Sequence, residues 1–200
     1  MGPQRLVPQE KDWALAATNV LLFIVSLVAF QRARKVNLGS AAAFLLQVCA
    51  AFLGTVCCCT GDVASVLCQS QREAAWASTV LGPALFAFAF HWTHRDRLAA
   101  NSVLTGALLA AACSDPLARG GQSPAVRAAV AAALLSVLTG SLFTVNGWGV
   151  AGSVLGLLSG ELPPAGPLCL GSPCVQNLLL VASTVALQRA LGAQDSAELL

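Results

Sequence analysis

A stretch of 33 residues without one charged side chain, from Ala128 to Gly160, constrains this chain more than any other feature. A helix that crosses a bilayer needs about 20 mostly apolar residues, whereas 33 helical residues would extend about 50 Å. Asn146-Gly147 interrupts the stretch with a strong turn signal, because both residue types tolerate a positive φ. The stretch therefore predicts two helices, at 128–145 and 150–162, joined by a tight turn.

The rest of the chain repeats this pattern of uncharged apolar runs. It is 56% apolar and only 10% charged, against about 25% charged in ordinary soluble domains, so it has too few charges to cover a soluble surface. Lipid offers backbone groups no hydrogen-bond partner, so the spans must be helices. We expect an all-α polytopic transmembrane helix bundle of seven spans, or of six if 150–162 is re-entrant, between polar tails at 1–12 and 192–200. The expected spans are 13–30, 36–56, 74–92, 98–113, 128–145, 150–162 and 175–191.

Charge next to the first span indicates the orientation. Arg32, Arg34 and Lys35 follow that span with no acidic residue among them. The positive-inside rule places this loop in the cytoplasm. The N-terminus is then outside and, with seven spans, the C-terminus is cytoplasmic, in the secretory and endolysosomal pathway or the plasma membrane. The net charge of +2 gives no reason to expect a nucleic-acid partner.

Cysteine positions provide a second indication of orientation. In the seven-span arrangement all but Cys49 of the eight cysteines lie at or near non-cytoplasmic loops, where disulfides persist. We expect bridges from the second loop to the fourth or sixth. The alternatives are small apolar residues at helix ends, or a palmitoylated Cys57–Cys59 cluster in the opposite orientation. The candidate disulfide residues are Cys57, Cys58, Cys59, Cys68, Cys113, Cys169 and Cys174.

Groups that could carry out chemistry are sparse. No expected span has a charged residue in its middle, as a proton relay, a voltage sensor or an ion-coupled pump would normally need. His91 and His94 share one side of a helix, but zinc needs three or four ligands and the chain has two histidines. We interpret them, with Arg95 and Arg97, as a basic interface that meets anionic lipid. We expect no catalytic, cofactor or metal site and no enzyme activity.

Side-chain amides inside the spans distinguish two functional hypotheses. Gln47, Asn101 and Asn177 lie at depths where amides usually hydrogen-bond to a neighbouring helix. If they pack between helices, the protein is a multi-pass membrane protein that acts through helix–helix contacts with other membrane proteins. If they converge on a wet cavity, it is a channel or transporter for a small neutral or lipid-like solute. The first is our leading hypothesis.

Two short motifs complete the sequence. Gly152, Gly156 and Gly160 form overlapping G-x-x-x-G repeats, which predict close helix packing against either this chain or a second copy. Asp195, Leu199 and Leu200 resemble the acidic dileucine sorting signal that clathrin adaptors bind on cytoplasmic tails. As a whole the chain resembles small multi-pass transmembrane proteins, and none of its motifs points to a specific family.

Overall fold

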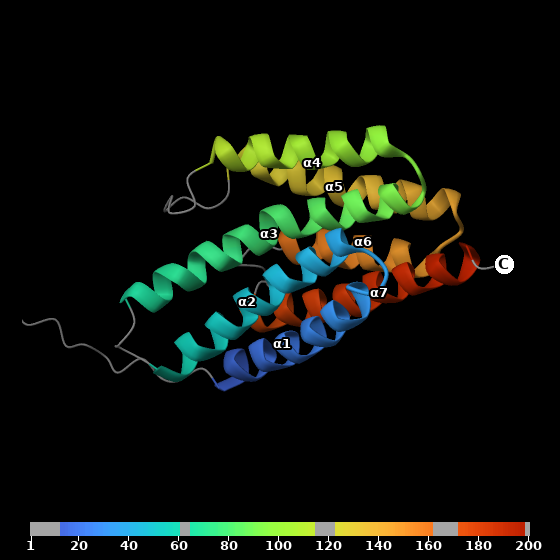
Figure 1. Cartoon of the computed structure of the whole chain (residues 1–200). Helices are drawn as coiled ribbons and strands as arrows, with labels where there is room; N and C mark the ends of the chain where they lie inside the picture. The colour runs from blue at the N-terminus through green and yellow to red at the C-terminus, as the bar shows by residue number, and fades with distance from the viewer. Residues whose placement is uncertain (1–12, 61–64, 115–122, 162–171, 199–200) are drawn as a thin grey trace, which may run out of the picture.

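The computed structural model describes residues 13–60, 65–114, 123–161 and 172–198, which form seven α-helices and no strand (Figure 1). Five of the helices are long and apolar enough to cross a membrane, and α4 and α6 are shorter. The helices are α1 (Trp13–Ala33), α2 (Leu38–Thr60), α3 (Ser65–Thr93), α4 (Arg97–Ala112), α5 (Pro124–Phe143), α6 (Gly147–Glu161) and α7 (Pro173–Glu198).

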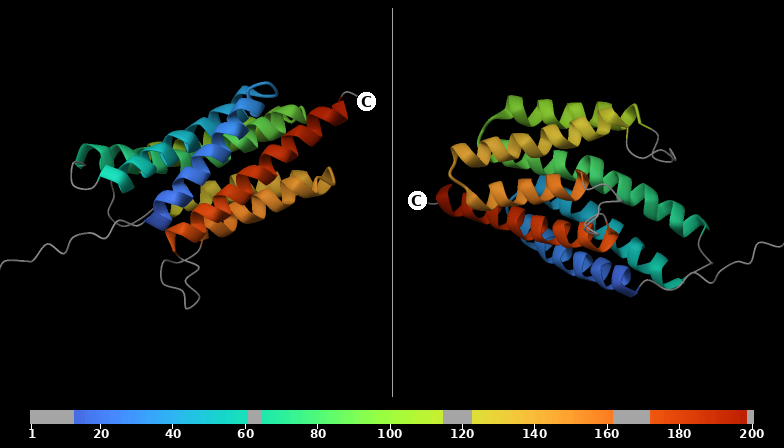
Figure 2. Two further views of the ribbon diagram at one scale, coloured as in Figure 1. Left: turned by 90° about the horizontal axis from the view of Figure 1, so that it is seen from below. Right: turned by 180° about the vertical axis from the view of Figure 1, so that it is seen from behind.

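Successive helices run up and down, so the bundle has two distinct ends (Figures 1 and 2). One end holds the short turns α1–α2, α3–α4 and α5–α6 together with the end of α7, and we call it the turn end. At the other end α1, α3, α5 and α7 begin, and we call it the cysteine end because Cys57, Cys58, Cys59 and Cys68 lie there. Helices that follow one another along the chain are therefore antiparallel, whereas the contacting pairs α1–α7 and α3–α5 run in the same direction.

An Asn or Asp side chain begins the helix after each short turn. Its oxygen accepts a hydrogen bond from a backbone N–H two or three residues further on, at 2.8 to 3.2 Å, which satisfies one donor that the helix leaves open. Arg95 and Val145, next to two of these caps, have positive φ values of 60° and 54° and reverse the chain direction. The three capping residues are Asn37, Asp96 and Asn146.

Six helices form a closed ring and α4 lies outside it. Around the ring, α1, α2, α3, α5, α6 and α7 each contact the next helix, and α7 returns to α1. Helix α4 packs mainly against α3 and α5, at the edge of the molecule in Figure 1 and in the right-hand view of Figure 2. One side of α4 is therefore left without a neighbouring helix.

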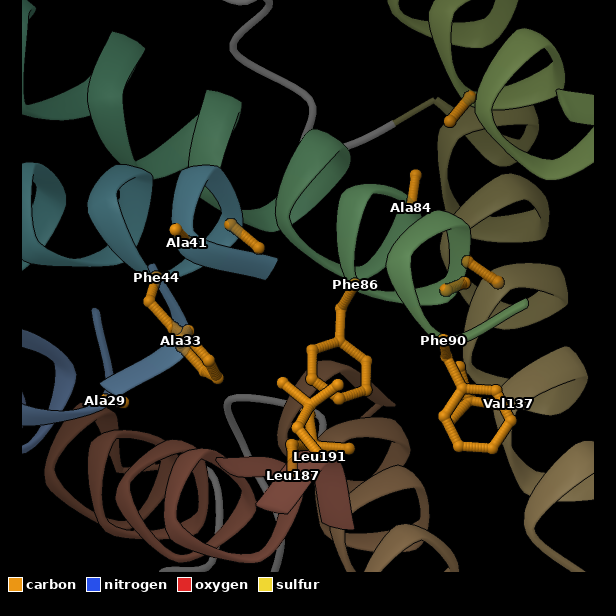
Figure 3. Close-up of a cluster of buried hydrophobic side chains, with 14 residues drawn as sticks. Ala29, Ala33, Ala41, Phe44, Ala84, Phe86, Phe90, Val137, Leu187 and Leu191 are labelled. Atoms are coloured by element: carbon orange, nitrogen blue, oxygen red, sulfur yellow. The ribbon is translucent and has the colours of Figure 1, made fainter. Parts of the chain in front are cut away.

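A cluster of buried side chains fills the ring towards the turn end (Figure 3). Phe86 of α3 points towards Leu187 and Leu191 of α7, and the Phe44 ring meets it edge-on at 6.1 Å between ring centroids. About half of the cluster is alanine. Small residues let helix backbones approach closely, and in a membrane this packing drives helix association.

The expected all-helical bundle is confirmed. Each expected span overlaps one helix, and the number of helices that cross the membrane stays a prediction. The largest differences from the expected spans are in two helices: α3 begins at Ser65 rather than residue 74, and α7 continues to Glu198 rather than ending at residue 191. Hydropathy marks where a helix enters hydrocarbon, but its backbone hydrogen bonds continue into water where the residues favour helix. Arg72 and Glu73 lie on such an extension of α3.

Candidate functional site

Asn177 joins α7 to α1 near the cysteine end. Its Nδ2 donates to Asn19 Oδ1 at 3.0 Å and to Thr18 Oγ1 at 3.2 Å. The same Asn19 side chain packs on α2, where a Cβ added to Gly54 would lie 3.2 Å from Asn19 Nδ2. Asn19 Nδ2 also donates towards Cys58 Sγ at 3.9 Å. One small polar cluster therefore connects three helices of the ring.

Gln47 makes a similar connection between α2 and α7. Its Oε1 accepts a hydrogen bond from Thr184 Oγ1 at 3.1 Å, and Thr184 itself is buried. The amides of Gln47 and Asn177 thus bind to neighbouring helices, which is the arrangement that the helix-contact hypothesis requires.

Asn101 differs from these two amides because it lies on the outer side of α4. Its side chain is exposed, and within the described ranges it has no hydrogen-bond partner. Ser102, Thr105 and Gly106 are exposed beside it, at spacings that place them along one side of the helix. We call Asn101, Ser102, Thr105 and Gly106 the α4 stripe. It is a surface of polar and small residues on the side of α4 that no helix of the ring covers.

The glycines of α6 face inwards at one end of the motif and outwards at the other. A Cβ on Gly152 would lie 2.7 Å from the Leu187 side chain and 3.0 Å from its backbone nitrogen. A Cβ on Gly156 would lie 3.3 Å from both Leu134 of α5 and Ser183 of α7. Gly160 is exposed and has nothing within 4 Å of its added Cβ. The structure thus places Gly152 and Gly156 against helices of the same chain.

The two histidine side chains contact other residues of this chain. His94 Nδ1 lies 2.9 Å from the carbonyl oxygen of Phe90, and its ring stacks on the Phe90 ring at 4.7 Å. His91 Nε2 is buried, and none of the residues that the structure describes hydrogen-bonds to it. Among the residues that the structure places, no three His, Cys, Asp or Glu side chains are close enough together to hold a metal ion.

Basic side chains gather at the turn end. Two of them stack on tryptophan: the Arg97 guanidinium carbon lies 5.2 Å from the Trp92 ring centroid, and that of Arg189 lies 4.6 Å from the Trp148 centroid. Tryptophan prefers the level of the lipid headgroups, so these pairs mark one membrane surface. The basic residues at this end are Arg32, Arg34, Lys35, Arg95, Arg97 and Arg189.

Two of the cysteines that the sequence singled out lie close together in the described structure. Cys57, near the end of α2, lies close enough to Cys68, near the start of α3, for the two thiols to interact. Both lie within one helix pair, whereas we expected bridges from the second loop to the fourth or sixth. Cys113 is exposed, and Cys169 lies outside the described residues. No disulfide joins the cysteines in the described ranges, and disulfide formation stays a prediction.

The expected sorting signal lies almost entirely beyond the described structure. Asp195 falls in the last turns of α7, and Leu199 and Leu200 lie outside the described residues. The signal therefore stays a prediction.

Comparison with known proteins identifies relatives that cover most of the chain. Transmembrane protein 276 of Homo sapiens is 36% identical over 154 residues, which is 74% of this chain and 76% of the relative. Transmembrane protein 276 of Mus musculus is 34% identical over 187 residues, or 92% of this chain and 94% of the relative. No family model matches the chain, and no solved structure matches it. The relatives' name describes a membrane protein and gives no activity.

Proposed function

The chain belongs to the Transmembrane protein 276 family, and from that premise we propose that it is a non-enzymatic membrane protein that binds a transmembrane helix of another membrane protein along the α4 stripe. The observation that carries this proposal is the exposed Asn101 amide on a helix that lies outside the ring. A polar group in hydrocarbon is unfavourable unless it has a hydrogen-bond partner. A polar side chain on a bound helix would supply that partner.

The shape of the stripe suits a helix rather than a bulky ligand. A Cβ added to Gly106 would meet nothing within 4 Å, so the α4 backbone is accessible from outside. Small residues at such positions let two backbones approach closely, and hydroxyl groups such as those of Ser102 and Thr105 can hydrogen-bond across the contact. Leu109, with 62% of its surface exposed, extends the same side towards the end of α4.

The solute-channel alternative receives less support from the geometry. Gln47 and Asn177, two of the amides that would have to line a path, form hydrogen bonds to Thr184 and to Asn19 on neighbouring helices. Phe86 packs with leucines of α7 between the helices at the turn end. These contacts favour a packed bundle whose polar groups stabilise it.

The test is site-specific photocrosslinking of the full-length chain in its own membrane. A photoreactive residue at Thr105 should give one discrete protein adduct, and Asn101→Leu should abolish it. The matched control is a photoreactive residue at Leu21 of α1, which is also exposed and should give no such adduct. Equal adducts from both sites, or an adduct that survives Asn101→Leu and Gly106→Leu together, would contradict the proposal.

For the orientation, we infer that the turn end faces the cytoplasm and the cysteine end faces the lumen or the outside. Support comes from Arg32, Arg34 and Lys35, which follow the first span with no acidic residue among them, since Lys and Arg next to a span are retained on the cytoplasmic side. A glycosylation acceptor inserted between α2 and α3 should be modified, whereas one inserted between α1 and α2 should not. The reverse pattern would overturn the orientation.

In that orientation Cys57 and Cys68 can form a disulfide. Their thiols are near neighbours, and an oxidising compartment supplies the oxidant, a disulfide-bearing oxidoreductase. Exchange would pass two electrons and two protons to that oxidoreductase, which is reduced to two thiols. Before reduction, maleimide should label the exposed Cys113 but not Cys57 or Cys68. After reduction it should label all three. Equal labelling of all three without reduction would exclude the bridge.

A further inference from the structure

A cleft of about 1220 Å³ opens at the turn end, between the α1–α2 turn and the junction of α3 with α4. We propose that this cleft binds the phosphate-bearing headgroup of an anionic phospholipid, with an acyl chain lying along its apolar side. The proposal rests on the lining of the cleft and is independent of the α4 stripe.

The cationic side of the cleft comes from Arg95 and Arg97. The positive φ of Arg95, 60°, places these two arginines on a tight turn, on either side of Asp96. The Asp96 carboxylate caps α4 by accepting a hydrogen bond from the Ala99 backbone N–H at 3.1 Å. Guanidinium groups bind phosphate oxygens through paired, charge-assisted hydrogen bonds. Two arginines from one turn therefore form a suitable phosphate site.

An aromatic pair positions one of these arginines. The Arg97 guanidinium carbon lies 5.2 Å from the Trp92 ring centroid, and the Trp92 ring stacks on Phe88 at 5.3 Å between centroids. Both aromatic residues line the cleft. Tryptophan at the end of a span marks the headgroup level, so the arginines lie where a lipid phosphate lies.

The apolar side of the cleft favours a lipid over free phosphate. Val36 of the α1–α2 turn and Leu38 and Ala42 of α2 line it, together with Phe88 of α3. Leu38 has 81% of its surface exposed at the rim, where an acyl chain would cover it. Inorganic phosphate would gain nothing from these contacts, whereas a phospholipid matches both sides of the cleft.

Neighbouring charge adds attraction for an anion. Arg34 and Lys35 lie on the α1–α2 turn that borders the cleft. Basic residues near the cytoplasmic surface attract anionic lipids within about one Debye length. The field of this turn therefore favours an anionic headgroup over a zwitterionic one.

The experiment is native mass spectrometry of the full chain in detergent with added phosphatidic acid or phosphatidylcholine. The wild type should retain one phosphatidic acid and no phosphatidylcholine. Arg95→Gln with Arg97→Gln should weaken that retention by about tenfold or more, because hydrogen bonds to charged groups are lost. The matched control Arg189→Gln removes another tryptophan-stacked arginine of the turn end, outside the cleft, and should leave retention unchanged.

A second variant keeps the proposal testable if the arginine variant does not fold. Ala42→Phe fills the apolar side without altering charge and should also reduce phosphatidic acid retention. Excess inorganic phosphate should not displace the lipid, and complete displacement would assign the site to free phosphate. Equal retention of the two lipids, or wild-type retention by a folded arginine variant, would overturn the proposal.

Discussion

Helices α4 and α5 contain the same five residues, Ser-Val-Leu-Thr-Gly, at 102–106 and 136–140. In α5, a member of the ring, Val137 is completely buried and a Cβ on Gly140 would lie 2.7 Å from Phe90 Cε1. In α4, outside the ring, a Cβ on Gly106 would meet nothing within 4 Å. The same small residues therefore allow close packing in both helices, but only in α5 does the glycine pack against another helix of this chain.

The two shorter helices differ in the same way. The glycine motif of α6 places Gly152 and Gly156 against α7 and α5, whereas the α4 stripe has no neighbour in the ring. In a membrane the alternative to a protein neighbour is lipid, so an uncovered polar stripe remains available for another protein. Substitutions at paired inner and outer positions test this difference.

The largest expected effect is at Gly152. Gly152→Leu would place a side chain against Leu187, including its backbone nitrogen at 3.0 Å from the added Cβ. We expect a loss of about 3 kcal/mol in unfolding free energy from overpacking, and loss of folding if the bundle is marginal. Thermal unfolding in detergent measures it. Gly160→Leu, on the same helix with open space around it, is the control. Equal stability of the two variants would show that the α6–α7 contact is not close.

The next prediction compares the same substitution in the two copies of the shared pentapeptide. Gly140→Leu should reduce the unfolding free energy by about 2 kcal/mol because the new side chain displaces the buried Phe90 ring. Gly106→Leu should leave the stability unchanged and instead abolish the photocrosslink from Thr105. If Gly106→Leu destabilises the isolated chain as much as Gly140→Leu, α4 is packed inside the bundle and the contrast fails.

Amides inside and outside the ring should also behave differently. Asn177→Leu removes the hydrogen bonds to Thr18 and Asn19 and should cost about 1 kcal/mol of unfolding free energy. Asn101→Leu removes no internal hydrogen bond and should leave the stability of the isolated chain unchanged or raised. Unfolding midpoints of the two variants, measured side by side, decide this, and a greater loss for Asn101→Leu would contradict it.

The smallest effect concerns a single hydroxyl group. Thr184→Val removes the hydrogen bond to Gln47 Oε1 and should cost about 0.6 kcal/mol, the average for such interhelical bonds in a membrane. Thr105→Val makes the same substitution at an exposed position on α4 and should not measurably lower the unfolding free energy. A double variant, Gln47→Leu with Thr184→Val, should then show a loss that is not additive.

Several local features were predictable from the sequence, and some were missed. The break between α5 and α6 at Asn146-Gly147 was predicted, but its geometry was not: the positive φ falls on Val145, and Asn146 caps α6 instead. The capping roles of Asn37 and Asp96 were missed, although an Asn or Asp directly before an apolar run is a signal for a helix start. The extension of α3 to Ser65 was missed because hydropathy does not report helix outside the lipid.

The candidate sites were predicted only in part. The amides and glycines were identified as packing residues by type, but their partners come from distant segments and no local pattern specifies them. Ser183, whose Oγ donates to the Gly152 carbonyl at 2.8 Å, gives no signal in the sequence. The same holds for the proximity of Cys57 and Cys68, because the sequence predicts which end of the bundle holds cysteines but not which two lie close together.

The sequence by itself determined that this protein is a helical membrane bundle and where its turns lie. Hydrophobicity, helix caps and the need to satisfy backbone hydrogen bonds in lipid are properties of contiguous residues. Only the tertiary structure decided which of two identical pentapeptides packs its glycine against a neighbouring helix and which amide is paired. Those outcomes depend on neighbours far away along the chain, as in the bond between Asn19 and Asn177, which are 158 residues apart.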